Sequence, residues 1–416
     1  MMTRSIGRRA VLGTITTLSL ATWIAQPRRA RGADAPIRIG VLTDMSGAYM
    51  DNTGPGSVAG AQLAVEDYRK IDASVRAEVI SADMLNKPDA ALGIAGEWYG
   101  DRGVDVILDL PLSSAALGLA SMAKERDKVA ILTGAGTADL TGKACGPNHL
   151  HWVYDTWSLP AGVAHALVAE GADTWYFITA DYAYGHSLKR DTAAHVVAAG
   201  GKVLGEALTP FPGTTEFSSY LLQARASGAK VIGLANGGAD VVNCIKQAAE
   251  FGFAKSGVRL AGLVFQINDV HSLGLEAAQG VMLTEPFYWD LNDGSRAFAK
   301  RIAPFIHGHM PSMDHAGVYS AVLHYLKAVS VLGTAKAKAS GAATIQQMKA
   351  MPTDDPLFGK GRIREDGRKI HDLYLFQVKT PDESKGPWDY YKLIRTIPAE
   401  QAFRPLSDGG CPLVKA

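Results

Sequence analysis

From Ile37 onward, short apolar runs alternate with longer amphipathic runs, and each apolar run ends in a Gly, Pro, Asp or Ser cluster. Apolar runs of this kind, separated by helical segments, are typical of strands buried on both faces of a parallel sheet. The predicted strands are Ile37–Leu42, Ala77–Ala82, Val104–Leu110, Val129–Thr133, Trp175–Thr179, Lys202–Ala207, Val231–Ala235 and Leu260–Phe265. The predicted helices between them include Val58–Tyr68, Ala115–Lys124, Leu159–Ala169, Leu188–Ala198 and Ala239–Phe251. Eight such units with right-handed crossovers predict an α/β fold with doubly wound parallel sheets.

The alternation pauses at Cys145–Trp157, where a Gly-Pro turn and an aromatic cluster predict a boundary between two lobes. After a strand-like run at Gly280–Trp289 the pattern becomes mostly helical, and two further strands follow. These elements are Arg296–Ile306, Gly317–Leu332, Thr344–Met351, Leu373–Val378 and Tyr391–Ile397. A chain that crosses between its lobes several times forms a multi-strand hinge. The predicted division is a first lobe of 36–155 plus 286–355, a second lobe of 156–285 plus 356–398, and a C-terminal tail of 399–416.

Residues 1–33 predict an export signal, because they carry six arginines and no acidic residue around the apolar run Ala10–Ala25. This run is shorter than the roughly 20 residues that a membrane-spanning helix needs. Arg8-Arg9 resembles the start of a twin-arginine signal, although Gly7 stands where such signals carry Ser or Thr, and general secretion is the alternative. We expect cleavage near Ala33 and a soluble periplasmic product.

Charge and cysteine content narrow the classes of function. Once the six arginines of the signal are removed, the formal net charge falls from +1 to about −5, which argues against a nucleic-acid partner. Three cysteines, Cys145, Cys244 and Cys411, are too few for a disulfide framework, and at least one of them stays unpaired. The hydrophobic core must therefore supply the stability of the fold. We also expect the protein to be a monomer.

The sequence predicts neither an enzyme nor a metal or cofactor site. It contains no Gly-x-Ser-x-Gly elbow, no His-Glu-x-x-His and no phosphate loop that ends in Gly-Lys-Ser/Thr. His149-x-His151 and His307-x-His309 resemble metal-binding pairs, but no Cys or acid stands at ligand spacing. Trp152, Tyr154 and Trp157 either stack on a ligand or pack at the lobe boundary.

The residues that follow the predicted strands are the candidate binding groups. Ligands of open α/β sheets bind beyond the carboxyl ends of the strands, near helix N-termini that present free amides. The candidates in the first lobe are Ser46 and Tyr49 after the first strand, Ser113 and Ser114 after the third, and Gly136 and Thr137 after the fourth. A serine at such a place caps a helix as readily as it binds a ligand. Three such loops at one sheet edge should nevertheless converge on one crevice.

Several motifs along the chain, taken in order, resemble those of one protein family. They are Ile39–Gly47, Gly60–Ala64, Ser113-Ser114 with Ala116-Leu117, Leu132–Thr137 and Asp181–Gly185. The set resembles the type I periplasmic binding proteins of the leucine/isoleucine/valine-binding branch, which implies two hinged lobes that capture a solute for the permease of an ABC transporter. The resemblance also implies that Ser114, Gly136 and Thr137 bind the carboxylate and ammonium of the solute and that Tyr184 closes over it. Core packing is the alternative role of Tyr184, and a sensor that signals to a receptor or regulator is the alternative function.

Departures from this branch bear on the solute. Amino-acid binders of the branch carry an acid after the fourth strand of the second lobe, whereas Leu263–Asp269 has none at the aligned place, and Asp269 is well placed to cap a helix. Asn236 and two glycines stand where such binders often carry an aromatic residue. A buried ammonium group without a counter-charge costs several kcal/mol. A carboxylic acid without an amine is therefore a candidate solute. The runs Asp269–Gly274 and Phe287–Asp290 resemble members of this family linked to the uptake of plant-derived aromatic acids, which implies an aromatic acid as the preferred solute, with amino acids next. We expect Asn236 and Gln266 to close onto the solute.

Overall fold

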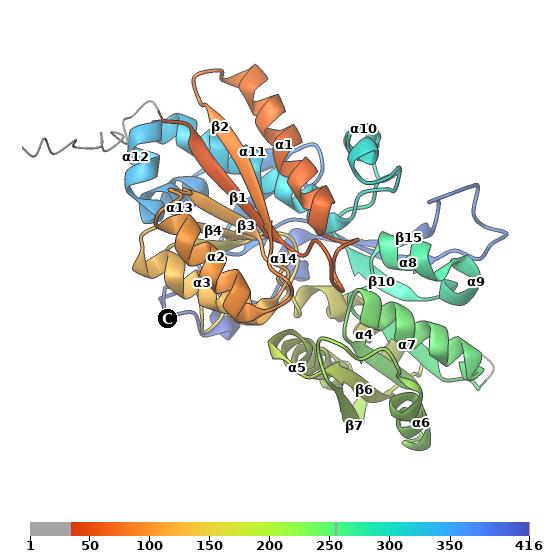
Figure 1. Ribbon diagram of the computed structural model, residues 1–416. Helices are drawn as coiled ribbons and strands as arrows, with labels where there is room; N and C mark the ends of the chain where they lie inside the picture. The colour runs from red at the N-terminus through yellow and green to blue at the C-terminus, as the bar shows by residue number, and fades with distance from the viewer. Residues whose placement is uncertain (1–34, 254–255, 416) are drawn as a thin grey trace, which may run out of the picture.

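The computed structural model describes residues 35–253 and 256–415, which form two α/β lobes, each built on a parallel sheet (Figure 1). The first sheet has the order β2-β1-β3-β4-β5, and the second has the order β7-β6-β8-β9. The strands of the first sheet are β1 Ile37–Thr43, β2 Ala77–Asp83, β3 Val106–Asp109, β4 Val129–Leu132 and β5 His149–His151. Those of the second sheet are β6 Thr174–Ala180, β7 Lys202–Thr209, β8 Val231–Ala235 and β9 Arg259–Gly262.

Helices cover both faces of the first sheet, because successive residues of its strands point to opposite faces and are apolar on both. Ile39 and Val41 of β1 belong to a buried cluster that includes α1 (Gly54–Ile71) and α11 (Met313–Leu332). Leu42 points to the opposite face, where α2 (Pro88–Tyr99) and α3 (Ser113–Glu125) pack. Because burying one such side chain contributes about 1.5–3 kcal/mol, a strand that is apolar on both faces is stable only between two helical layers.

The second sheet is covered in the same way. Trp175 and Phe177 of β6 face α4 (Ser158–Ala169) and α5 (Ala183–Ala198). Tyr176 and Ile178 alternate to the other face, where α6 (Ser218–Ala226) and α7 (Ala239–Glu250) lie. The predicted fold class, two doubly wound parallel sheets, is therefore confirmed.

The remaining elements join and extend the two sheets. An antiparallel sheet β10-β14-β15 and a small antiparallel sheet β11-β12-β13 complete the fold. Their bounds are β10 Met282–Glu285, β11 Thr353–Asp355, β12 Gly359–Ile363, β13 Lys369–Ile370, β14 Leu373–Val378 and β15 Tyr391–Ile397. The other helices are α8 Ile267–Leu273, α9 Leu275–Ala278, α10 Asp293–Ile302, α12 Thr334–Ala339, α13 Gly341–Ala350 and α14 Ala399–Ala402, with 3-10 turns at η1 Ala138–Thr141, η3 Ala303–Phe305 and η4 Leu406–Gly409.

A disulfide ties the C-terminal segment to the first lobe. Cys145, which follows η1, pairs with Cys411, 266 residues later in the chain. Arg404 adds a hydrogen bond of 3.0 Å from its guanidinium to the carbonyl of Ala138. Cys244 is a free cysteine buried in α7, so the expectation that one cysteine stays unpaired is confirmed.

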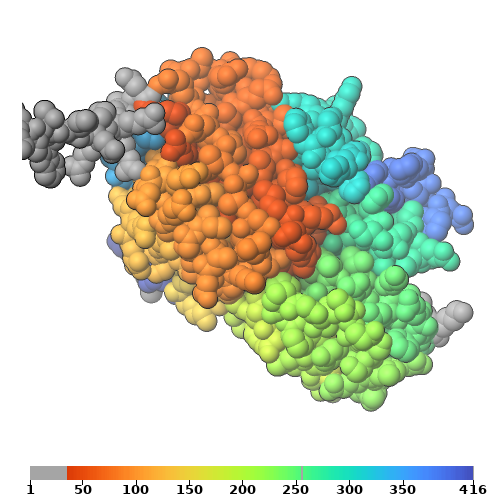
Figure 2. Space-filling view, viewed as in Figure 1, coloured from red at the N-terminus to blue at the C-terminus, as the bar shows by residue number. Residues whose placement is uncertain are grey.

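The two lobes meet along a seam that the segment after β1 crosses (Figure 2). The amide of Ala239 donates to the carbonyl of Ala48 at 3.1 Å. Asn268 Nδ2 donates to the carbonyl of Asp51 at 2.7 Å. These bonds join the loop after β1 to the N-termini of α7 and α8, so the lobes are closed onto one another.

The expected export signal at 1–33 lies outside the described residues. Within 35–253 and 256–415, no helix is both long enough and apolar enough to cross a membrane.

Candidate functional site

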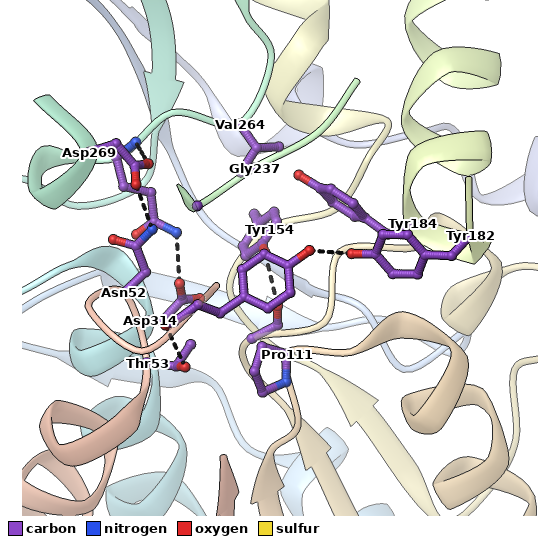
Figure 3. A pocket seen from close by; sticks show the side chains of 14 residues that line it. Asn52, Thr53, Pro111, Tyr154, Tyr182, Tyr184, Gly237, Val264, Asp269 and Asp314 are labelled. Atoms are coloured by element: carbon purple, nitrogen blue, oxygen red, sulfur yellow. Dashed lines mark hydrogen bonds between the residues drawn. The ribbon is translucent and has the colours of Figure 1, made fainter. Parts of the chain in front are cut away.

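A cavity lies between the two sheets at the carboxyl ends of their strands (Figure 3). Its volume is about 360 Å³, including the open solvent at its mouth. Its walls come from loops after β1, β3, β4 and β5 in the first lobe, loops after β6, β8 and β9 in the second, and the start of α11. The lining residues are Tyr49, Asn52, Thr53, Pro111, Gly134, Tyr154, Tyr182, Tyr184, Gly237, Gly238, Val264, Gln266, Asp269 and Asp314. This is the place where open α/β sheets bind ligands.

Tyrosines form one wall of the cavity. The hydroxyl groups of Tyr49 and Tyr182 hydrogen-bond to each other across the seam. Phe211 stacks on Tyr182 at a ring-centroid distance of 4.4 Å and so holds that ring in place. The hydroxyl of Tyr154 donates to the carbonyl of Gly134 at 2.9 Å. Burial raises the pKa of each of these tyrosines well above 10, so their hydroxyls remain protonated hydrogen-bonding groups.

Acids and amides form the opposite wall, where Figure 3 shows Asn52, Asp269 and Asp314 facing Tyr182 and Tyr184. Asp269 Oδ1 accepts a hydrogen bond of 3.1 Å from Asn52 Nδ2 across the seam. Its Oδ2 accepts the backbone amide of Gln266 at 2.8 Å, which caps α8. Gln266 Nε2 in turn donates to Asp314 Oδ2 at 2.8 Å. No Arg, Lys or His is among the lining residues.

Burial governs the protonation of these acids. It raises the pKa of Asp269 to about 7, an effect that hydrogen bonds from Gln266 and Asn52 partly oppose. Burial, together with Asp109 and Asp269, also raises the pKa of Asp314 well above its usual range. The cavity therefore carries less negative charge near neutral pH than two ordinary carboxyl groups would give it, so an anion is not excluded from the cavity.

Several buried polar atoms at the cavity have no hydrogen-bond partner within the described chain. They are Asn52 Oδ1, Gln266 Oε1, Asp314 Oδ1 and both side-chain atoms of Asn236. Each parent side chain is at most 4% exposed. A buried polar group without a partner costs about 1–3 kcal/mol, so such atoms mark the place where a bound solute supplies the missing partner.

Five of the sequence-predicted residues gather at this cavity. Tyr49, Tyr184, Gln266 and Asp269 line it, and Asn236 is the neighbour of the lining residue Gly237. Asp269 both caps α8 and faces the cavity, so its two proposed roles coexist.

The other predicted residues are not among those that line the cavity. One reason is that the ring of Tyr184 covers the loop that carries Gly136. A Cβ on Gly136 would lie 2.7 Å from Cε2 of Tyr184, so this ring rests on the loop after β4. Ser113 Oγ accepts the amide of Thr137 at 3.2 Å, and Thr137 Oγ1 donates to Ser187 Oγ at 3.1 Å. Ser114, next to Ser113 at the start of α3, is partly exposed. Ser46 lies apart, since its hydroxyl donates to Asp83 at 2.7 Å.

Residues that the sequence did not single out complete the site. Asp314 was missed because the predicted helix began at Gly317, whereas the observed helix begins at Met313. Ser312 followed by an acid in the first turn was the signal for the earlier start. Asn52 and Tyr182 lie in loops that follow predicted strands, but no sequence signal separates their side chains from their neighbours.

His149 and His151 of the first histidine pair, and Trp152 of the aromatic cluster, are buried in structural surroundings. Burial lowers the pKa of His149 to about 4 and that of His151 to about 3, and each ring contacts a backbone carbonyl. No cluster of three His, Cys, Asp or Glu side chains that could hold a metal ion occurs among the described residues. Trp152 packs in the core, where its indole donates to Ser320 Oγ, while Tyr154 lines the cavity.

The family model described as "Periplasmic binding protein" matches residues 36–387. The chain belongs to the periplasmic binding protein family. Its fold and family are those of solute-binding proteins, so the cavity between the sheets of this binding protein is its candidate solute site.

Solved structures agree with this assignment. A periplasmic binding protein from Burkholderia mallei is 45% identical over 92% of this chain and 100% of its own, with a TM-score of 0.88. A branched-chain amino acid ABC transporter periplasmic ligand-binding protein from Burkholderia xenovorans is 39% identical over 91% and 99%, with a TM-score of 0.79. A solute-binding protein of an ABC transporter from Rhodopseudomonas palustris, in complex with 3,4-dihydroxybenzoic acid, is 22% identical over 88% and 98%, with a TM-score of 0.77, and shows the shared fold. No curated protein sequence matches this binding protein.

Proposed function

We propose that this binding protein is the periplasmic component of an ABC transporter that captures a small solute bearing a carboxylate and passes it to the membrane permease. The observation that carries the proposal is the cavity at the carboxyl ends of both sheets, which holds buried polar atoms without partners. The relative from B. xenovorans, 39% identical, is described as an ABC transporter ligand-binding protein. The alternative function is that of a sensor, in which a receptor or regulator recognises the closed, solute-bound form.

In the proposed mechanism, the carboxylate first meets the open first lobe. Ser114 and the amides around Gly136 and Thr137 receive it, because the N-terminus of α3 carries no side-chain cap and presents a positive dipole end. Tyr184, which rests on Gly136 in the closed form, moves aside with the second lobe. Closure then brings Tyr184, Asn236 and Gln266 onto the solute, and the closed state gains population only to the extent that the solute contacts it better.

Aromatic acids are the first solute class that we propose. Four tyrosines line the cavity, and their rings offer faces and edges for an aromatic ring. The pKa of Asp269, raised to about 7, keeps a large fraction of this carboxyl protonated near neutral pH, and the protonated form is able to donate to a carboxylate.

Amino acids are the second class, and a specific observation favours them. On the sequence alone they rank below aromatic acids, because no acid stands at the aligned place after the fourth strand of the second lobe. In the structure Asp269 and Asp314 both face the cavity, so an ammonium group has acidic partners within the site. The reason for the lower rank is thereby weakened.

The two lobes that close in this mechanism are proposed to be 36–155 plus 286–355 and 156–285 plus 356–398, with the tail 399–416 outside them. Residues 1–33 are proposed to be an export signal that is removed in the periplasm. The mature chain is proposed to act as a monomer, without a cofactor and without catalysis.

A thermal-shift panel tests the proposal. Benzoate, 4-hydroxybenzoate, leucine and valine are each added to the purified protein, and the melting temperature is recorded. A solute at 100 times its Kd stabilises the folded state by about 2.7 kcal/mol, which raises the melting temperature by several degrees. Replacing Ser114 and Thr137 with Ala should abolish the shift without unfolding the protein. A protein that none of the carboxylates stabilises would contradict the proposal, and unchanged shifts in the variant would remove both residues from the site.

A further inference from the structure

Asp314 occupies a fixed position at the seam between the lobes. It lies in the first turn of α11, and Ser312 Oγ accepts its backbone amide at 3.2 Å. The next residue, His315, contacts the carbonyl of Thr53 through Nε2 at 2.8 Å and so ties this turn to the loop after β1. The backbone that carries Asp314 is therefore anchored on the first lobe.

The side chain of Asp314 is anchored on only one of its two oxygens. Oδ2 accepts Gln266 Nε2 at 2.8 Å, a bond that crosses to the second lobe. Oδ1 has no hydrogen-bond partner among the described residues, although Asp314 is 1% exposed and lines the cavity. Gln266 Oε1 is buried and likewise lacks a partner within the part of the chain that the structure describes. Because Gln266 donates through Nε2 to Asp314, its free atom is an oxygen, which accepts hydrogen bonds. A solute donor bound at Asp314 Oδ1 favours the ionised carboxylate, so both free atoms act as acceptors toward such a solute.

We propose that Asp314 Oδ1 and Gln266 Oε1 form a subsite that selects solutes carrying a hydrogen-bond donor, an amine or a hydroxyl group, in addition to their carboxylate. This inference rests on the proposed function, because it assigns the specificity of the same cavity. The donor of the solute satisfies acceptors that the closed protein leaves unpaired, and a solute without a donor buries them at a cost. The selected solutes therefore share a hydrogen-bond donor. The ring or aliphatic chain that bears this donor fills the side of the cavity that the tyrosines line.

Asp314→Asn is the informative variant because it keeps the shape of the side chain. The Asn oxygen takes over the hydrogen bond from Gln266 Nε2, so the amide nitrogen faces the cavity. A donor of the solute then meets a donor of the protein. Asp293→Asn is the matched control, since Asp293 also lies in the first turn of a helix, α10, but its side chain is fully exposed and outside the cavity.

The test compares solute pairs that differ only in the donor. Leucine is paired with 4-methylpentanoate, which lacks the amine, and 4-hydroxybenzoate is paired with benzoate, which lacks the hydroxyl. Titration calorimetry measures Kd for all four with the wild-type protein and both variants, and thermal melting confirms that each variant is folded. We expect the donor-bearing member of at least one pair to bind at least about tenfold more tightly to the wild-type protein, and the pair that discriminates identifies the donor as amine or hydroxyl.

In Asp314→Asn this preference should disappear or reverse, whereas Asp293→Asn should retain it. Equal binding of both members of each pair to the wild-type protein, or a preference that Asp314→Asn leaves unchanged, would overturn the inference while the proposed function stands. Should none of the four carboxylates bind to any of the proteins, the proposed function and the inference that rests on it would both be wrong.

Discussion

Asp269 places a titrating group inside the cavity near the pH at which the protein is expected to work. Its pKa of about 7 means that it is protonated at pH 6 and ionised at pH 8. Asp109, with a pKa raised to about 6, and Asp240, with a pKa raised to about 7, ionise over the same range, and burial is the main cause for both. Raising the pH therefore makes the surroundings of the cavity more negative.

The sign of the pH effect differs between the two proposed classes of solute. We predict that the affinity for benzoate falls as the pH rises from 6 to 8, because the new charges repel an anion. The affinity for leucine should rise over the same range, because ionised carboxylates attract its ammonium group. Each pKa unit of coupling corresponds to about 1.4 kcal/mol, so changes of several-fold are expected. Titration calorimetry at pH 6, 7 and 8 measures both profiles, and flat profiles for every solute that binds would contradict the prediction.

Gly136 is the residue at which the absence of a side chain matters most for the site. A methyl group there would meet Tyr184 Cε2 at 2.7 Å and Tyr154 Cε2 at 3.2 Å. We predict that Gly136→Ala displaces Tyr184 from its place over the loop and weakens solute binding at least about tenfold. Kd by titration calorimetry is the measurement. Gly93→Ala is the control, because its added methyl group meets no atom within 4 Å and should leave Kd unchanged.

At the scale of the elements, sequence patterns predicted eight of the nine strands in the two main sheets, all except β5. Strands such as β4 and β8 are continuous apolar runs because both faces are buried, and such runs are visible without a structure. The strands β5, β11 and β13 have three, three and two residues, which is too short to show a period. They exist because neighbouring backbone is already in place, as the bridge from His151 to Arg368 illustrates.

The same distinction applies to the site. Loops after predicted strands supplied Tyr49, Tyr184, Gln266 and Asp269, because parallel strands end at one edge of a sheet. Asp314 arrives from α11, a helix that follows β10 and returns to pack against α1, a long-range contact that local patterns do not encode. The covering of Gly136 by Tyr184 depends on how the closed lobes meet, and this is equally invisible in the sequence.

The disulfide stabilises the segment that carries η1. A cross-link restricts the conformations of the unfolded chain, and this typically adds about 2–4 kcal/mol to the free energy of unfolding. We predict that the double variant Cys145→Ser, Cys411→Ser lowers the free energy of unfolding by that amount, measured by urea denaturation. It should also loosen the tail whose Arg404 braces Ala138. Cys244→Ala is the comparison, because it removes a thiol and leaves the cross-link intact, and an equal loss in both proteins would contradict a specific effect of the disulfide.

At the scale of the whole molecule, closure brings the loop after β1 against the start of α7. Gly238 has φ of +59°, and a Cβ there would lie 2.2 Å from the carbonyl oxygen of Ala48. We predict that Gly238→Ala keeps both lobes folded but prevents them from closing fully. Solute binding should weaken at least about tenfold, and the compaction that the solute induces in small-angle X-ray scattering should be lost.

Gly200→Ala is the matched control for this prediction. Gly200 also has a positive φ, +92°, but a Cβ there meets no atom within 4 Å. An alanine at Gly200 also carries the strain of a positive φ, about 1–2 kcal/mol, while the seam between the lobes is untouched. Equal losses of affinity in both variants would show that backbone strain, and not obstruction of closure, is responsible.

The separation of Cys145 from Cys411 has a consequence for biosynthesis. The chain has three cysteines, so Cys244 is the thiol that competes with Cys411 for Cys145. Disulfides form in oxidising compartments, and folding of α7 encloses Cys244 completely. A second lobe that folds before oxidation therefore withdraws the wrong partner, and Cys145 is left to pair with a cysteine 266 residues away.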